Sequence, residues 1–266
     1  MTDSITRLNS SRSQRTLWLL EECKDLDWDV KIYKRNSETM LAPDELKKVH
    51  PLGKSPVIEV DAPGLSKPLV IAESAFMSEY LCDHFAPHLV PKRYQEGKEN
   101  EVGGETEQWI RYRFYMHYAE GSLMSMLMIA FFMDREWLLP LKHNTWQLIS
   151  GTDIRNAPVP FFIKPITRRI ASGVDDMYLT ANFKTHFGFL ESQLTSSPED
   201  GQYLCGKSLT AADILMSFPL IASQSRIDKE AYPKLLEYIA RLEENDMYKR
   251  SVKKAEEASG EPYKVM

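Results

Sequence analysis

The side chains best placed to do chemistry lie in residues 48–76, where two features frame a pair of short apolar runs. Ser55-Pro56 stands directly before the run Val57–Val60, and Glu73-Ser74 follows the run Leu69–Ile71 and opens a helical pattern. Proline donates no backbone N–H, so the chain beside it is open to a ligand or a loop. A helix N-terminus has unpaired N–H groups and a partial positive charge, which attract carboxylates. The stretch therefore predicts an exposed backbone and an anion site at one end of a small sheet.

The sequence Gly53-Lys54-Ser55-Pro56-Val57, followed by Glu73-Ser74-Ala75, resembles the glutathione site of the glutathione transferases. The resemblance implies that Ser55, before a cis-proline at Pro56, pairs its main chain with the cysteinyl unit of glutathione. It implies also that Glu73 and Ser74 hold the γ-glutamyl group. Lys54 becomes a candidate partner of the glycyl carboxylate, and His50 a candidate ligand contact. The alternatives are a hairpin followed by a helix cap, a solvated lysine and a surface or packing histidine.

Transferases of this family activate the cysteine thiol of glutathione with a hydrogen-bond donor at the first strand-to-helix turn. A free thiol has a pKa of roughly 8.5, and a donated hydrogen bond favours its anion. The corresponding turn here is Asn9-Ser10-Ser11-Arg12-Ser13. This turn contains no tyrosine or cysteine, which excludes the tyrosine-type and cysteine-type classes of the family.

Several residues of this turn are candidates for the catalytic donor. Alignment of Arg15-Thr16-Leu17 with the Arg-x-Val of the serine-type classes puts the catalytic serine on Ser11, with Ser10 one register away. Asn9 could donate through its amide, and Arg12 could supply positive charge near the thiolate. The alternative is that Ser11 or Ser13 only caps the first helix.

Short strands alternate with helical patterns in the first part of the chain, and this predicts a small mixed sheet with helices on its faces. We expect strands at Ser4–Leu8, Val30–Tyr33, Val57–Val60 and Leu69–Ile71, and helices at Ser13–Asp25, Pro43–Val49 and Ser74–Phe85. The same order is that of the thioredoxin-like domain of glutathione transferases. The predicted fold class is α/β plus all-α, with a thioredoxin-like domain over residues 1–90, a linker over 91–104 and an all-helical domain over 105–266.

The second part of the chain has helical patterns and no convincing alternating strand. We expect helices at Thr106–Arg135, with a bend at Gly121, and at Asp175–Leu194, Leu209–Ser223 and Pro233–Lys249, an irregular stretch at Leu138–Pro165 and a mobile tail at Glu256–Met266. Thr210 and Asp213 form a Thr-x-x-Asp pattern before an apolar run, which predicts a capping box. This box resembles that of the transferase C-terminal domain. The start of the first helix and the insert Pro160–Pro165 most resemble a fungal and bacterial branch of the family.

The acceptor substrate of such a transferase is expected to bind on the second domain. Tyr112, Tyr115 and Met116 lie on its first long helix, and aromatic and methionine side chains suit a plastic pocket for apolar electrophiles. The alternative is that these residues form helix–helix core or a dimer surface. His84 and His88 have the spacing of a metal pair, but Pro87 interrupts their helix and no third ligand is evident, so no metal site is expected.

Composition limits the remaining function classes. The chain has 266 residues, a formal net charge of −5 and dispersed basic residues, which gives no reason to expect nucleic-acid binding. Its 3 cysteines are widely spaced, which fits a reducing compartment better than a disulfide framework. The polar N-terminus lacks a signal-peptide core, and no apolar run is long enough for a membrane span. A cytoplasmic protein without a membrane partner is the expectation.

The resemblance implies a homodimeric glutathione transferase that joins the glutathione thiolate to small electrophilic molecules in detoxification. Glutathione-dependent peroxidase activity is a common side activity of the family, and the sequence neither confirms nor excludes it. A thiol–disulfide oxidoreductase would need a reactive thiol at the first turn, and the nearest cysteine is Cys23. A non-catalytic protein that binds glutathione or another ligand, or regulates a partner, is the remaining alternative.

Overall fold

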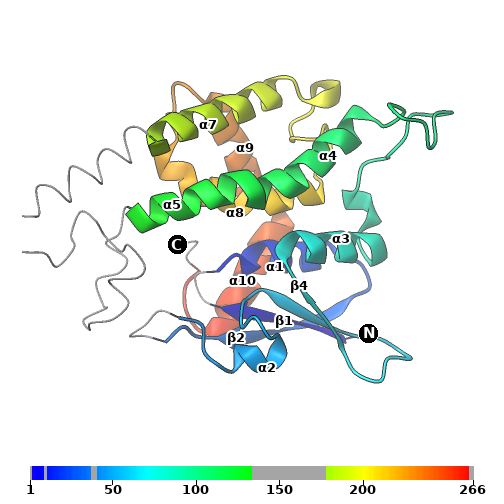
Figure 1. Cartoon of the computed structure of the whole chain (residues 1–266), viewed down its shortest axis with the longest axis vertical. Coiled ribbons are helices and arrows are strands. Elements are labelled where there is room, and N and C mark those ends of the chain that lie inside the picture. Colours follow the sequence, from blue (N-terminus) through cyan, green and yellow to red (C-terminus); the bar gives the residue numbers. More distant parts are fainter. Residues whose placement is uncertain (1, 9–10, 37–40, 134–177, 264–266) are drawn as a thin grey trace, which may run out of the picture.

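The computed structural model of the chain describes residues 2–8, 11–36, 41–133 and 178–263. A mixed sheet forms the N-terminal domain, and helices form the C-terminal domain (Figure 1). The expected fold class is confirmed, whereas the boundaries at 1–90, 91–104 and 105–266 stay a prediction. Within the described residues, no helix is both long enough and apolar enough to cross a membrane.

The sheet has 4 strands in the order β2-β1-β3-β4. β1 pairs in parallel with β2 and antiparallel with β3, and β3 pairs antiparallel with β4. The strands are β1 (Thr2–Leu8), β2 (Asp27–Tyr33), β3 (Val57–Asp61) and β4 (Leu69–Ala72). The parallel β1–β2 pair is joined through a helix, as parallel pairs require. β4 is an edge strand and exposes Leu69 and Val70.

Two helices cover the side of the sheet that faces the helical domain (Figure 1). They are α1 (Ser13–Glu22) and α3 (Ser74–His84), whereas the short α2 (Leu46–Val49) connects β2 to β3. Every residue of α1 from Ser13 to Leu20 is buried, because the helix packs against the sheet, α3 and helices of the second domain. The helix expected at Pro43 begins only at Leu46, since residues 44 and 45 form a turn.

The second domain opens with α4 (Glu107–Tyr118), a π-helical turn η2 (Ala119–Met124) and α5 (Ser125–Met133). The Thr106 hydroxyl caps α4 by accepting from the Trp109 N–H at 3.2 Å. The π-helical turn contains Gly121, the residue at which a bend was expected. The expected irregular stretch Leu138–Pro165 and the insert Pro160–Pro165 lie outside the described residues.

The remaining helices are α7 (Thr180–Thr195), α8 (Ala211–Ser223), α9 (Pro233–Glu244) and α10 (Asp246–Ser259). Short 3-10 turns lie at η1 (Pro87–Leu89), η4 (Pro198–Asp200) and η5 (Gln224–Arg226). The expected helix Pro233–Lys249 is wrong at its end. Asn245 interrupts it and begins α10, because its side-chain oxygen accepts from the N–H groups of Met247 and Tyr248 at 2.8 and 3.1 Å.

The predicted mobile tail is wrong for its described part. Glu256 lies within α10, and its carboxylate accepts from the Tyr263 N–H at 2.8 Å. The Arg7 guanidinium of β1 lies 5.6 Å from the centre of the Tyr263 ring. α10 packs against α1 and β2, so the C-terminal segment holds the two domains together.

The capping box at the start of α8 is confirmed. Thr210 donates both its N–H and its hydroxyl to the Asp213 carboxylate, at 2.9 and 2.6 Å. Asp213 is fully buried and accepts also from the Leu204 N–H at 3.0 Å and the Tyr238 hydroxyl at 2.7 Å. A buried carboxylate needs such donors, and here they tie α8 to α9 and to the preceding turn.

Candidate functional site

Ser55 closes the end of the ladder between β1 and β3. The register ends at the pair Thr6 and Val57, because the next residue, Pro56, has no N–H to donate. The Ser55 hydroxyl takes over: it accepts from the Leu8 N–H at 3.0 Å and donates to the Thr6 carbonyl at 2.9 Å. The Ser55–Pro56 peptide bond is cis, as the sequence resemblance implies. With its hydroxyl engaged by β1, Ser55 has its main chain to offer a ligand.

Glu73 and Ser74 form the start of α3. Glu73 has φ 73° and ψ 117°, a left-handed φ that costs a non-glycine residue roughly 1–3 kcal/mol and is concentrated at functional sites. Its side chain is exposed, whereas Ser74 is half-buried. The Ser74 hydroxyl accepts a hydrogen bond from the Arg15 guanidinium at 3.3 Å. The helix start and the guanidinium both place positive charge where a carboxylate of a ligand would bind.

Two further predicted contacts lie beside Ser55. Lys54 precedes it in the chain and is exposed. His50 ends α2 and is half-buried, and its Nδ1 accepts from the Leu52 N–H at 3.3 Å. His50 therefore shapes the turn that leads to Ser55, which agrees with the packing alternative and leaves its other ring nitrogen for a ligand.

The first turn and Ser55 meet through a chain of serine hydroxyls. The Ser11 Oγ lies 2.6 Å from the Ser13 Oγ, which in turn lies 3.1 Å from the Ser55 Oγ. Ser11 also accepts from the Ser13 N–H at 3.3 Å. Ser11, the expected donor, is thus connected through Ser13 to Ser55, the expected peptide-binding residue. Asn9 and Ser10 lie outside the described residues.

Arg12 and Arg15 share one carboxylate partner, Glu120, on the π-helical turn of the second domain. The Arg15 side chain is only 1% exposed and also donates to the Leu215 carbonyl of α8 at 3.1 Å. It therefore contacts α3, η2 and α8 at once. The acidic partner of Arg15 thus comes from the other domain.

The charges of this cluster are set by burial and by one another. Burial lowers the pKa of Arg15, an effect that Glu120 opposes. Burial alone would raise the pKa of Glu120, but the guanidinium groups of Arg15 and Arg12 outweigh it and hold that pKa below its usual value. The cluster thus holds two cations and one anion, and this surplus positive charge lies next to the Ser74 helix start and the first turn.

The expected acceptor residues are in the core. Tyr112, Tyr115 and Met116 are each 2% exposed or less. They lie on the side of α4 that packs against the rest of the helical domain, so the acceptor-pocket expectation is not supported for these three. The alternative of helix–helix core describes them. Burial raises the pKa of Tyr112 and Tyr115 as well.

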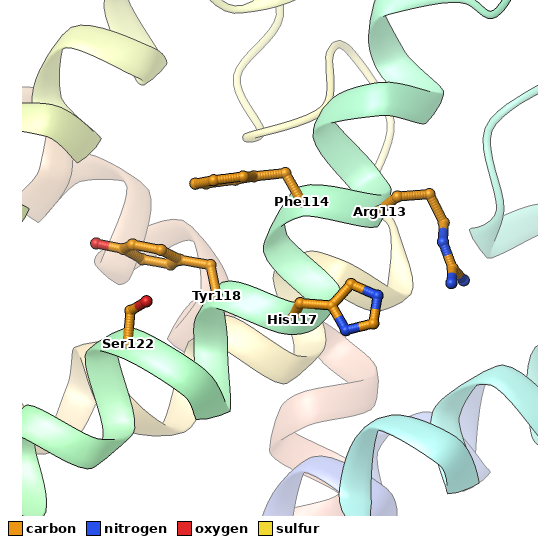
Figure 2. Close-up of a pocket in the computed structure, with 5 residues that line it drawn as sticks. All are labelled: Arg113, Phe114, His117, Tyr118 and Ser122. Atoms are coloured by element: carbon orange, nitrogen blue, oxygen red, sulfur yellow. The ribbon is translucent and has the colours of Figure 1, made fainter.

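An open pocket of about 400 Å³ lies over other residues of the same helix. It is lined by Arg113, Phe114, His117, Tyr118 and Ser122. Figure 2 shows Phe114 and Tyr118 extending to one side of the helix, and Arg113 and His117 to the other. The two aromatic rings stack with centroids 5.3 Å apart, and the Tyr118 hydroxyl lies 2.5 Å from the His186 Nδ1 of α7. The residue types along α4 did not reveal this pocket. The side of α4 that faces outward depends on the helices that pack against it.

The cysteines do not provide a reactive thiol at the site. Cys23, Cys82 and Cys205 are all buried. Burial raises the pKa of Cys82 and of Cys205, and a buried thiol of raised pKa is a poor nucleophile. The thiol–disulfide oxidoreductase alternative therefore lacks its reactive group.

Comparisons with known proteins agree with this geometry. The family model of the glutathione S-transferase N-terminal domain matches residues 9–84, and that of the C-terminal domain matches residues 152–250. Glutathione S-transferase 1 of Saccharomyces cerevisiae is 30% identical over 250 residues, which cover 93% of this chain and 93% of the yeast protein. The chain belongs to the glutathione transferase family. Its co-substrate is the glutathione of that family. Glutathione S-transferase 3 of Schizosaccharomyces pombe is a second relative of this transferase, 30% identical over 82% of the chain and 72% of that protein.

Solved structures agree with the fold of this transferase. A glutathione S-transferase from Actinobacillus pleuropneumoniae has a TM-score of 0.61 and 25% identity, over 95% of this chain and 92% of its own. A homologue from Lodderomyces elongisporus, solved with two glutathione molecules per subunit, has a TM-score of 0.62 and 17% identity, over 94% of this chain and 97% of its own.

Glu120 gives the first testable prediction for this transferase. Replacing it with glutamine leaves Arg15 buried without a countercharge, and we expect Glu120→Gln to lower the free energy of unfolding by about 2–3 kcal/mol at neutral pH. Because the pKa of Glu120 is depressed in the folded protein, its contribution is full above the unfolded value of roughly 4.3 and is lost as pH falls below it. Urea unfolding of the wild-type protein and of the variant between pH 3 and 7 measures the two free energies. A difference that persists unchanged at the lowest pH would contradict the ionic role.

Proposed function

We propose that this transferase joins the glutathione thiolate to small apolar electrophiles. The observation that carries the proposal is the serine at the first turn: the Ser11 hydroxyl lies in hydrogen-bond contact with Ser13, which contacts Ser55. In a complex, the Ser55 main chain would hold the cysteinyl unit, and the α3 start at Glu73 and Ser74 the γ-glutamyl carboxylate. With these anchors, the cysteine sulfur would lie beside the first turn.

The chemistry assigned to the site is activation of a thiol and proximity. A hydrogen bond from the Ser11 hydroxyl favours the thiolate over the thiol, and the surplus positive charge of Arg12, Arg15 and Glu120 acts in the same direction. The thiolate then attacks the electrophile, a bond from sulfur to carbon forms, and the leaving group departs with its electron pair. Ser10, Asn9 and Arg12 stay alternative donors. No bond to the protein forms, so the contribution of the site is electrostatic and geometric.

Ser11→Ala tests the assignment. Without the donor, we expect the pKa of the bound thiol to rise by about one unit and turnover of a chloronitrobenzene to fall about tenfold at neutral pH, with little change in the KM for glutathione. The thiolate absorbance of the complex reports the pKa. An unchanged pKa and rate would remove Ser11 from the role.

The wild-type protein separates the remaining functions in the same assays. Retention on immobilised glutathione without turnover would favour the non-catalytic, ligand-binding alternative. Reduction of cumene hydroperoxide in the presence of glutathione would add the peroxidase side activity. We propose a role in cytoplasmic detoxification on the same basis, since a reducing compartment supplies the glutathione that the site needs.

We propose that the acceptor binds in the pocket of Figure 2. Phe114 and Tyr118 give it an apolar wall, and Phe114 remains 46% exposed. Arg113 and His117 of α4 lie about two turns and one turn before Glu120, which follows on η2 and contacts Arg12 of the first turn. This proximity along the helix supports the proposal that the acceptor would bind near the glutathione sulfur.

Phe114→Ala tests the acceptor site. Loss of the exposed ring removes apolar contact with the acceptor, so we expect the KM for the chloronitrobenzene to rise about threefold to tenfold while the KM for glutathione stays the same. Ile110→Ala is the matched control, because Ile110 lies one turn earlier on α4, is 53% exposed and does not line the pocket. Equal effects of both substitutions would contradict the assignment.

We propose also that the protein is a homodimer with two-fold symmetry. Leu69, Val70 and Phe76 are 43%, 39% and 54% exposed, and they lie on the edge strand β4 and on α3. Apolar side chains gathered at a sheet edge are typical of a protein–protein interface, and an isologous dimer is the commonest assembly.

Phe76→Glu tests this interface. A carboxylate buried against an apolar partner surface without a countercharge is costly, so we expect the variant to sediment as a monomer at micromolar concentration. Val102→Glu, a substitution in the exposed loop before α4, is the control and should leave the dimer intact. A wild-type protein that sediments as a monomer would refute the dimer.

A further inference from the structure

The three serine hydroxyls at the first turn form a chain whose direction can be read from the number of protons. Each hydroxyl has one proton to donate and two lone pairs that accept. The Ser55 hydroxyl donates a hydrogen bond to the Thr6 carbonyl at 2.9 Å and accepts one from the Leu8 N–H at 3.0 Å. The remaining contact of Ser55, at 3.1 Å to Ser13, can therefore only be one in which Ser13 donates.

The same count fixes the next contact. Because the Ser13 hydroxyl already donates its hydrogen bond to Ser55, Ser11 must be the donor in the 2.6 Å contact between Ser11 and Ser13. Ser13 is fully buried, so water does not replace either partner. In the free protein the proton of Ser11 therefore points into the protein, away from the place of a bound sulfur.

We propose that Ser13 is a positioning residue that turns the Ser11 proton toward the glutathione sulfur when the ligand binds. The inference rests on the proposed role of Ser11. In the complex, Ser11 donates to the thiolate, Ser13 turns to donate to Ser11, and Ser55 turns to donate to Ser13. Each serine keeps its one proton, the proton of the thiol leaves to solvent, and the Thr6 carbonyl gives up the hydrogen bond from Ser55.

This reversal has a physical advantage over rotation of Ser11 alone. If only Ser11 turned, no proton would lie between the Ser11 and Ser13 oxygens, and this short hydrogen bond would be lost. When all three turn, the contacts among the serines are kept, and the one hydrogen bond given up is the 2.9 Å bond to the buried Thr6 carbonyl instead of the shorter 2.6 Å bond between Ser11 and Ser13. A donor that itself accepts a hydrogen bond is also polarised and donates more strongly, which favours the thiolate. Both the reorientation of the chain and the polarisation of Ser11 therefore require the hydroxyl of Ser13.

Ser13→Ala tests the relay in the complex with glutathione. We expect the pKa of the bound thiol to rise by roughly half a unit to one unit, with a matching fall in kcat and little change in the KM for glutathione. Ser13→Thr keeps the hydroxyl and should keep the wild-type pKa. Ser78→Ala is the control for loss of a nearby buried serine, since Ser78 donates to the Ser74 carbonyl at 2.9 Å and is outside the chain of hydroxyls.

The outcomes separate the relay from a role in packing and from the proposed function. A Ser13→Ala variant with lower thermal stability but an unchanged thiol pKa would overturn the relay and leave Ser13 as a helix-start residue, as would a Thr variant that behaves like the Ala variant. The double variant Ser11→Ala, Ser13→Ala should match Ser11→Ala alone; an additive rise would overturn the inference. A wild-type protein that binds glutathione without turnover refutes the proposed conjugation, whereas the thiol pKa still decides the relay.

Discussion

The buried guanidinium of Arg15 is the interaction on which the arrangement of the two domains depends. It lies in α1 and contacts Ser74 at the start of α3. In the second domain it pairs with the Glu120 carboxylate and donates a hydrogen bond to the Leu215 carbonyl. A buried cation is costly unless paired and hydrogen-bonded, so the two domains are held at the positions that satisfy it. Those positions bring η2 against the first turn. The same carboxylate of Glu120 therefore joins the domains and contacts Arg12 of the turn that we propose activates the thiol.

The end of the β1–β3 ladder explains why the site is next to this ion pair. Pro56 cannot continue the ladder, and the hydroxyl of Ser55 completes it instead. That hydroxyl is also the last member of the chain from Ser11 through Ser13. Hydrogen bonds thus connect the end of the β1–β3 ladder to the first turn. A single proline links the place where a peptide ligand would pair to the orientation of the expected donor.

Much of the fold could be predicted because its signals are local. The capping box of Thr210 and Asp213 and the strand–helix order need only neighbouring residues, and each is confirmed. The predictions that were wrong or not supported concern contacts between distant residues, which local signals do not record. The break at Asn245 was missed, although asparagine is a common N-cap residue, because the new helix α10 packs against α1, and a pattern along the chain does not show that contact. Tyr112, Tyr115 and Met116 have side chains suited to a pocket, but the face of α4 that points inward is decided by α8.

The sequence by itself determined the ligand class, through the resemblance of Ser55-Pro56 and Glu73-Ser74 to the glutathione site of the family, because each motif is a pair of neighbouring residues that can be recognised without the fold. The same resemblance limited the expected donor to the turn at residues 9–13. Only the tertiary structure decided the partners of that turn: Glu120 is 108 residues from Arg12, and Ser55 is 42 residues from Ser13. Contacts over such separations form when helices and strands pack, and a periodic pattern records which residues are buried but not which residues they meet.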